Sequence, residues 1–110
     1  MRIREQNILG INGAEFSVSV GLVNQGIAKG LIYRNDGSPG SETLLSTIDR
    51  LLRMLSTDRE TLDGICITLG PGSFTSLRVS LSVAQAMGLA LDIPVYGVNN
   101  LVLIASSVPY

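Results

Sequence analysis

The residues that come nearest to a chemical motif lie between positions 70 and 78. The turn Gly70-Pro71-Gly72-Ser73 leads into Phe74 and Thr75, and Arg78 follows one helical turn later. A Gly-rich turn at a helix start can hold an anion, because free backbone N–H groups and the helix dipole point there. However, Thr75 stands where the dinucleotide fingerprint has its third glycine, and the Lys-Ser/Thr pair of a P-loop is missing. We therefore favour a structural strand-to-helix turn and keep anion binding as the alternative.

Other reactive side chains are sparse. The sequence has no histidine and one cysteine, Cys66, which excludes His-dependent nucleophile pairs, His-ligated metals and Cys-rich metal sites within the chain. Cys66 stands between Ile65 and Ile67, a pattern that predicts an inert core thiol. Glu42 and Asp49 lie on one face of an expected helix, where a solvated acidic edge is favoured over a working carboxylate pair. We expect no catalytic residue, no metal ligand and no cofactor.

Composition limits the partners of the chain. Its 110 residues make one small domain, and 45% apolar residues suffice for a core. Eight basic and nine acidic residues give a net charge of −1. This balance offers no general attraction to phosphate backbones, so we expect no direct binding of nucleic acid by the chain alone. No apolar run has the length of a signal peptide or a spanning helix, and a lone cysteine fits a reducing compartment. We therefore expect a cytoplasmic protein without a membrane segment.

The first half of the chain predicts three strands and a helix. Residues 7–12 (NILGIN) form a short apolar run, and 16–23 (FSVSVGLV) alternate with the period of two of a strand. The hairpin turn Asn24-Gln25-Gly26 leads into a third strand over 26–33, which predicts an antiparallel meander. A helix follows, with Ser41 as its N-cap. Its apolar stripe consists of Leu44, Leu45, Ile48, Leu51, Leu52 and Leu55.

The second half alternates strands and helices. Thr57 and Glu60 have the spacing of a capping box for one short helical turn. Residues 64–69 (GICITL) are apolar almost throughout, which predicts a strand covered on both faces. The remaining expected elements are a helix capped by Ser73 and ending near Leu91, a strand over 94–98, and a helix over 101–105 capped by Asn99 or Asn100.

Three segments resemble the TsaB (YeaZ) family. Residues 69–101 (LGPGSFTSLRVSLSVAQAMGLALDIPVYGVNNL) are similar to the family's GRGPGSFTGLR-like turn, its small-residue helix and a strand like IPVxGVSSL. Residues 8–22 (ILGINGAEFSVSVGL) are similar to ILAIDTSxxxxSVAL, and residues 41–52 (SETLLSTIDRLL) resemble HSExLLPxIDxLL. The matches cover the chain from Ile8 to about Ala105 in the family's order, and the Gly70–Arg78 turn is the most specific of them.

This resemblance implies an α/β fold of the RNase H-like, actin-like (ASKHA) type. Its mixed five-stranded sheet has the order 3-2-1-4-5, with helices after strands 3, 4 and 5. The resemblance also implies a role in the threonylcarbamoyl modification of the adenosine beside the tRNA anticodon. By the same resemblance the chain is a non-catalytic subunit that binds a TsaD-like subunit, which holds metal and nucleotide and transfers the group. The pair then recruits a TsaE-like ATPase, and an isolated TsaB-like subunit forms a homodimer.

The sequence departs from the family pattern at informative positions. Asn12 replaces the first-strand Asp, and the neutral amide lacks the charge that a hard cation favours. Gly13 and Ala14 stand where the family has hydroxyl residues, Gly40 replaces a His, and Ser76 replaces a Gly. Relatives are about twice as long. We therefore expect residues 1–110 to form a single domain like the N-terminal lobe of TsaB, without the second lobe.

Small residues recur every fourth position along the second long helix, at Ser76, Ser80, Ala84 and Gly88. They leave a groove that another helix can enter. In a sheet of order 3-2-1-4-5, right-handed crossovers put both long helices on one face, so the groove could receive the first helix of the same chain. The alternative, implied by the resemblance, is a four-helix bundle with a partner. The interface would be formed or supported by Leu44, Leu45, Ile48, Ser76, Leu77, Ser80 and Ala84.

We therefore expect a non-catalytic partner subunit whose interface uses the helices. The sequence does not determine which face of the first helix points outward. On this hypothesis, Ala84→Arg abolishes association and leaves the fold intact. The alternative function is a small ATPase or a glycoprotease-like (M22-type) peptidase, after an older label of the group. Asn12 and the absence of histidine argue against that alternative.

Overall fold

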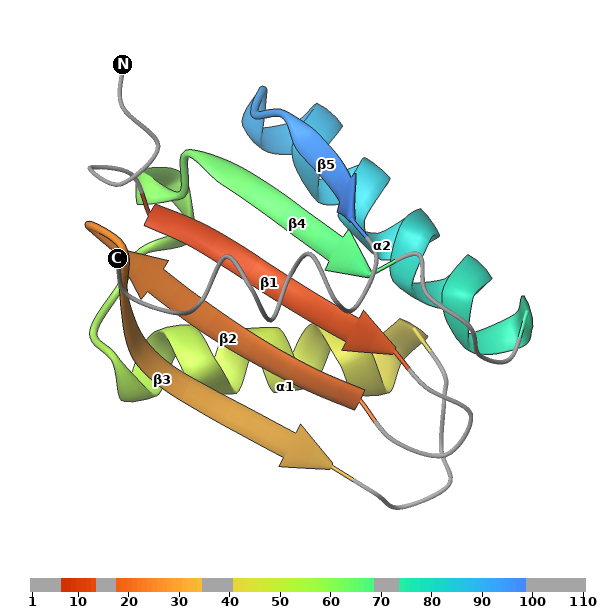
Figure 1. Ribbon diagram of the computed structural model, residues 1–110, viewed down its shortest axis with the longest axis horizontal. Coiled ribbons are helices and arrows are strands. Elements are labelled where there is room, and N and C mark those ends of the chain that lie inside the picture. The colour runs from red at the N-terminus through yellow and green to blue at the C-terminus, as the bar shows by residue number, and fades with distance from the viewer. Residues whose placement is uncertain (1–6, 14–17, 35–40, 69–73, 99–110) are drawn as a thin grey trace.

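The computed structural model describes residues 7–13, 18–34, 41–68 and 74–98. Five strands form one sheet of order β3-β2-β1-β4-β5, the order expected from the resemblance (Figure 1). The strands are β1 (Asn7–Gly13), β2 (Val18–Asn24), β3 (Ile27–Arg34), β4 (Gly64–Thr68) and β5 (Val95–Val98). The helices are α1 (Ser41–Met54), α2 (Phe74–Leu91) and the short 3₁₀ turn η2 (Arg59–Thr61). The helix expected over 101–105 lies outside the described residues.

The first three strands form the expected antiparallel meander. Gln25 and Gly26 make the turn between β2 and β3, with φ angles of 54° and 77°. Positive φ at both central residues is the pattern of the hairpin turn whose twist matches its strands. The register between β2 and β3 then shifts after Leu22, which leaves Lys29 as the extra residue of a bulge.

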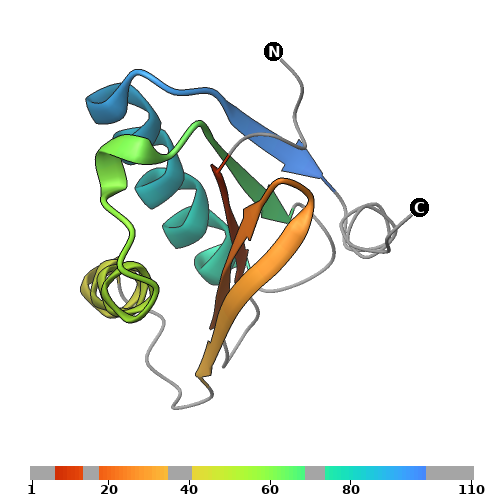
Figure 2. The ribbon, with the colours of Figure 1, turned by 90° about the vertical axis from the view of Figure 1, so that its left-hand side faces the viewer.

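Both long helices lie on the same side of the sheet (Figure 2). α1 packs over β2 and β3, and α2 packs over β1, β4 and β5. β4 is parallel to β1, and β5 is parallel to β4. Each of the two helices therefore crosses between parallel strands in the same direction, and right-handed crossovers place them on one face, as the sequence predicted.

The core fills the space between this helix layer and the sheet. Alternate strand residues point into it, so that Leu9 and Ile11 of β1 meet Ile65 and Ile67 of β4 across the parallel register. The remaining buried members come from β2, the helices and the loop before β4: Val20, Leu22, Leu44, Ile48, Leu51, Leu52, Leu62, Val83 and Ala84. Burial of each large side chain contributes about 1.5–3 kcal/mol. This cluster therefore dominates the stability of the fold.

Both long helices end in the same way. At the end of α1, Ser56 has φ 50° and the N–H of Thr57 donates to the carbonyl of Leu52 at 2.9 Å. At the end of α2, Asp92 has φ 56° and the N–H of Ile93 donates to the carbonyl of Gly88, also at 2.9 Å. A left-handed residue followed by this bond to the last turn is the Schellman motif.

The predicted capping box at Thr57 and Glu60 is wrong. The N-cap of η2 is Asp58, and it makes no side-chain capping bond. The Thr57 hydroxyl instead donates to the carbonyl of Leu55 at 3.0 Å, because Thr57 belongs to the end of α1. Ser41, expected as the cap of α1, is its first helical residue.

Within the described ranges, no helix combines the length and the hydropathy needed to cross a membrane.

Gly88 allows α2 and β5 to approach each other closely. A Cβ at this position would lie 2.6 Å from Cγ2 of Val95 and 3.0 Å from the carbonyl oxygen of Ile93. Gly costs an isolated helix about 1 kcal/mol relative to Ala. In this helix the packing against β5 therefore outweighs the helix propensity.

We predict that Gly88→Ala lowers the free energy of unfolding by about 1–3 kcal/mol, the usual cost of overpacking. Urea denaturation measures the loss. Ser82→Ala, at an exposed position of the same helix, serves as the control and is expected to change stability by a few tenths of a kcal/mol. The Gly88→Ala loss should shrink in a Val95→Ala background. An equal loss in both backgrounds would contradict the packing argument.

Candidate functional site

Polar side chains meet where the parallel strands β1 and β4 end. Asn12 stands near the carboxyl end of β1 and Thr68 at the end of β4. The Thr68 hydroxyl donates to Oδ1 of Asn12 at 2.7 Å. Thr68 is buried, and Asn12 is half-buried. The carboxyl ends of strands are where open α/β sheets bind ligands, so this pair marks the position of a classical ligand crevice.

The pair of Asn12 and Thr68 carries no charge. An amide and a hydroxyl have already paired there, and neither offers the negative charge that a hard divalent cation favours. No group of three His, Cys, Asp or Glu side chains that could hold a metal occurs among the described residues. The arrangement can therefore fix the ends of the two strands to each other.

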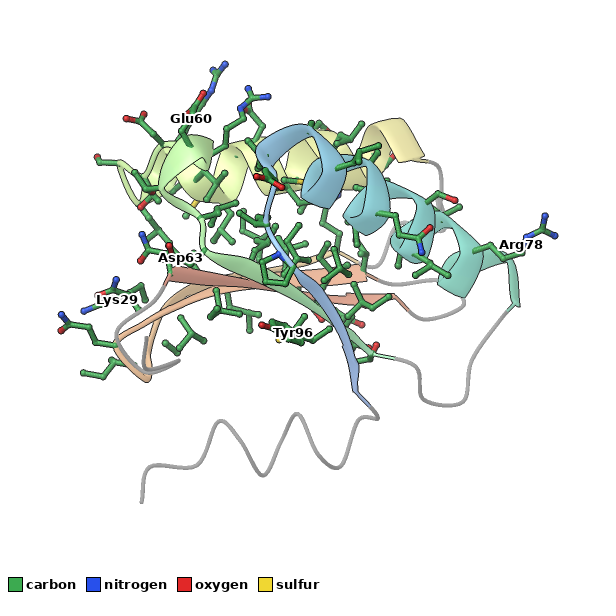
Figure 3. All side chains as sticks on the ribbon, turned by 90° about the horizontal axis from the view of Figure 1, so that it is seen from above. Lys29, Glu60, Asp63, Arg78 and Tyr96 are labelled. Carbon is green, nitrogen blue, oxygen red and sulfur yellow. The ribbon has the colours of Figure 1, made fainter. Side chains whose placement is uncertain are left out.

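The predicted turn motif is only partly described. The segment Gly70–Ser73 lies outside the described residues, so the anion alternative stays a prediction. Phe74 and Thr75 begin α2, and their side chains are not described. Arg78 is exposed and points away from the sheet (Figure 3).

The predicted interface residues do not lie on one surface. Leu44, Ile48 and Ala84 belong to one buried cluster between the two helices and the sheet. Ser80 is buried as well, whereas Leu45 is exposed on α1. The side chains of Ser76 and Leu77 lie outside the described residues. The buried residues of this set can therefore support an interface only indirectly, by holding the exposed residues of the helices in place.

The small-residue stripe of α2 packs inside the chain over its described part. Ser80, Ala84 and Gly88 are all buried, and Gly88 lies against β5. Ala84 is 0% exposed, so there is no space for an arginine. The expectation that Ala84→Arg leaves the fold intact is therefore wrong. This substitution would force a charged side chain into the core and unfold the domain.

A second stripe of small residues on α2 faces outward, and the sequence analysis missed it. We define the outer α2 surface as the exposed residues Ser82, Gln85, Ala86, Leu89 and Ala90. Leu89 is 87% exposed. No charged residue occurs between Arg78 and Asp92, although an exposed helix face normally carries charges. The sequence feature that could have revealed this surface is the uncharged run. The fourfold spacing of small residues could not reveal it, because that spacing occurs on both faces of the helix.

The outer face of α1 differs from that of α2. It carries Arg50 and Arg53 beside Leu45 and Met54. Arg53 pairs with Asp49 at 3.0 Å, but the two side chains are 81% and 47% exposed. Such an exposed pair contributes little to stability. The solvated acidic edge expected at Asp49 is thus an ion pair in solvent, and the side chain of Glu42 is not described.

Two other groups have structural roles. Nη1 of Arg34, in β3, donates to the hydroxyl of Thr47 at 3.1 Å and so ties the edge strand to α1. Cys66 is half-buried on the sheet face opposite the helices, and it is the only residue of β4 that is not fully buried, so the strand is covered largely as expected. Burial raises the pKa of the Cys66 thiol. A raised pKa lowers the thiolate fraction at neutral pH, in agreement with the inert thiol that was expected.

A cleft of about 450 Å³ lies at the opposite end of β1, beside the end of α1. Its walls include Asn7, Asn24, Lys29 and Thr61. The amide of Asn24 donates to Oδ1 of Asn7, and Nδ2 of Asn7 lies 3.3 Å from the hydroxyl of Thr61. The side chains of Asn7, Asn24 and Thr61 thus bond to one another, so this cleft is best explained as the junction between strand, turn and helix.

Comparisons with known proteins give a consistent result. Residues 39–109 match the family model described as "TsaD: tRNA N6-adenosine threonylcarbamoyltransferase". A tRNA N6-adenosine threonylcarbamoyltransferase of Tropheryma whipplei is 58% identical over 41 residues. The tRNA threonylcarbamoyladenosine biosynthesis protein TsaB of Buchnera aphidicola is 34% identical over 62 residues. The structure of YeaZ from Pseudomonas aeruginosa superposes with a TM-score of 0.81 at 28% identity, which confirms the RNase H-like, actin-like α/β fold.

The chain matches only parts of these proteins. It covers 46% of the YeaZ chain, while 91% of its own length is matched. The matches take in 10% of the Tropheryma protein and 28% of the Buchnera protein. Activities and partners of the whole relatives therefore do not transfer directly to this chain.

The bond between Thr68 and Asn12 gives a testable prediction. Thr68→Val keeps the shape of the side chain but removes the hydroxyl donor, so it should lower the free energy of unfolding by about 1–2 kcal/mol. In an Asn12→Ala background the same substitution should cost less, because the acceptor is already gone. Urea denaturation of the four proteins measures this coupling. Equal costs in both backgrounds would show that the two side chains do not interact.

Proposed function

Because the chain belongs to the TsaB (YeaZ) family, within the wider group that the TsaD model describes, we propose that it is a non-catalytic subunit in the synthesis of threonylcarbamoyladenosine in tRNA. Its task is to bind a TsaD-like subunit through its helix layer. The TsaD-like subunit carries out the transfer, and a TsaE-like ATPase joins the pair. In the absence of that partner, the same surface pairs two copies of the chain.

The outer α2 surface is the observation that carries this proposal. Its small residues allow another helix to come close, and its uncharged character removes the cost of burying charges at an interface. Leu89 provides an exposed apolar side chain on the same surface. Aliphatic and small residues without charge are typical of the centre of a helix-to-helix interface, where charged residues are depleted. Leu45 extends the apolar surface of the helix layer onto α1.

The neutral strand end supports a role without catalysis. Asn12 and Thr68 pair with each other at the place where an actin-like enzyme would position metal and phosphate. The net charge of −1 supports an arrangement in which a partner, and not this chain alone, binds the tRNA. We infer that the complex works in the cytoplasm, where an unpaired thiol such as Cys66 stays reduced.

We predict that Ala86→Arg weakens binding to the TsaD-like subunit of the same organism at least tenfold. The arginine would bring an unpaired charge and a large side chain into the closest part of the interface. Because Ala86 is exposed, thermal unfolding of the isolated chain should stay nearly unchanged. Isothermal titration calorimetry measures the affinity, and light scattering reports whether the homodimer is lost as well.

Ala28→Arg is the matched control. Ala28 is exposed on β3 and pairs with Val23, on the sheet face away from the helices. This variant should bind the TsaD-like subunit as tightly as the unchanged chain. Unchanged affinity of Ala86→Arg would exclude the outer α2 surface as the interface. Micromolar binding of Mg²⁺ and ATP by the chain alone would favour the ATPase alternative over the whole proposal.

A further inference from the structure

The outer edge of β3 is the longer of the two open edges of the described sheet (Figure 1). β3 has 8 residues, whereas β5 at the other end has 4. An edge strand presents backbone N–H and C=O groups that can pair with a further strand. The bulge at Lys29 disturbs the start of β3. The regular part of the edge therefore consists of residues 30–34, about 17 Å of strand.

Large apolar side chains are exposed along this edge. Leu31 is 69% exposed and Tyr33 is 62% exposed. They pair with Gly21 and Ser19 of β2, so both lie on the sheet face away from the helices. Natural edge strands are usually protected by charged side chains. Between the bulge and its last residue β3 carries no charge, so the regular part of the edge lacks this protection.

One flank of α1 borders the same edge. The bond from Arg34 to the hydroxyl of Thr47 shows that the Thr47 side of the helix faces β3. Arg50 and Met54 follow Thr47 by three and seven residues, so they lie on the same flank. Both are exposed. The flank therefore places a cation and an apolar side chain beside the open backbone of β3.

Arg50 forms no ion pair with another side chain of the described ranges. The neighbouring Asp49 pairs with Arg53 at 3.0 Å, and β3 itself contains no acidic residue. A second copy of the chain, paired edge to edge, would bring its own Arg50 to the same seam, and the two cations would repel each other. Charge therefore favours a partner that carries carboxylates.

We propose that the edge of β3 binds an extended segment of a partner protein as a sixth strand, and that this segment alternates acidic and apolar residues. Successive side chains of a strand point to opposite faces. The acidic side chains lie on the helix side and meet Arg50, and the apolar side chains lie beside Leu31 and Tyr33. In strand addition the backbone bonds provide affinity and the alternate side chains provide specificity.

This inference concerns an edge of the sheet, whereas the proposed function rests on the outer α2 surface. Either can therefore fail while the other stands.

The probe is a fluorescein-labelled heptapeptide of alternating glutamate and valine, titrated with the full chain and followed by fluorescence anisotropy. We expect micromolar binding. The same peptide with lysine in place of glutamate should bind at least tenfold more weakly. A glutamate–valine peptide that is N-methylated throughout keeps its side chains but loses every N–H donor, so it should not bind. Hydrogen exchange of residues 30–34 should slow in the complex with the unmodified peptide.

Charge reversal on α1 tests the role of Arg50. Arg50→Glu should weaken binding of the glutamate peptide at least tenfold and strengthen binding of the lysine peptide. Arg78→Glu makes the same change of charge at an exposed position of α2, and it should leave both affinities unchanged. Thermal unfolding verifies that both variants stay folded. If Arg50→Glu does not fold, the comparison of the three peptides on the unchanged chain still decides.

Four results would overturn the proposal. Absence of binding by every peptide would show that the edge does not accept a strand. Binding that survives N-methylation would show that backbone bonds are not used. Equal affinities for the glutamate and lysine peptides would remove the role of Arg50. Hydrogen exchange of residues 30–34 that slows with protein concentration alone would assign the edge to a second copy.

Discussion

Right-handed connection of parallel strands is the constraint on which the rest of this structure depends. β3 is antiparallel to β2, which is antiparallel to β1, so α1 and α2 both link parallel strands and cross the sheet in the same direction. Both helices must then cover the same face. One consequence is a well-packed core under the helices; the other is a second face of the sheet that neither helix can reach.

Sequence patterns located the elements well, because each has a strong local signal. The period of two in β2, the leucine stripe of α1 and the Asn-Gln-Gly turn all predict their observed structures. The sheet order came from the resemblance to a family, since pairing between distant strands leaves no local mark. The capping box at Thr57 failed for a local reason: the end of α1 extends to that residue and uses its N–H group in the Schellman motif.

The interface could be predicted only in part, because spacing does not distinguish the two sides of a helix when both carry small residues. Ser80 and Ala84 follow the same fourfold spacing as Ser82, Ala86 and Ala90. The packing of α2 against α1 and the sheet decides which set is buried. The uncharged run from Val79 to Leu91 was visible in the sequence and indicates that both sides avoid charge. The absence of charge on the exposed side is the feature on which the proposed interface rests.

The two faces of the sheet therefore differ in what they require of the sequence. On the helix side, large side chains such as Leu9 and Ile65 fill the core. On the other side, glycines persist in the middle of β1 and β2, although Gly weakens a strand by its entropy and its lack of packing. Neither Gly10 nor Gly21 adopts a positive φ, so backbone conformation does not explain them. The packing of side chains accounts for one of them, because a Cβ at Gly21 would lie 3.4 Å from Cδ1 of Leu31 on the neighbouring strand. The same argument is stronger at Gly88 on the helix side, where a Cβ would lie only 2.6 Å from Cγ2 of Val95, so a glycine is required there by the close approach of a strand to a helix.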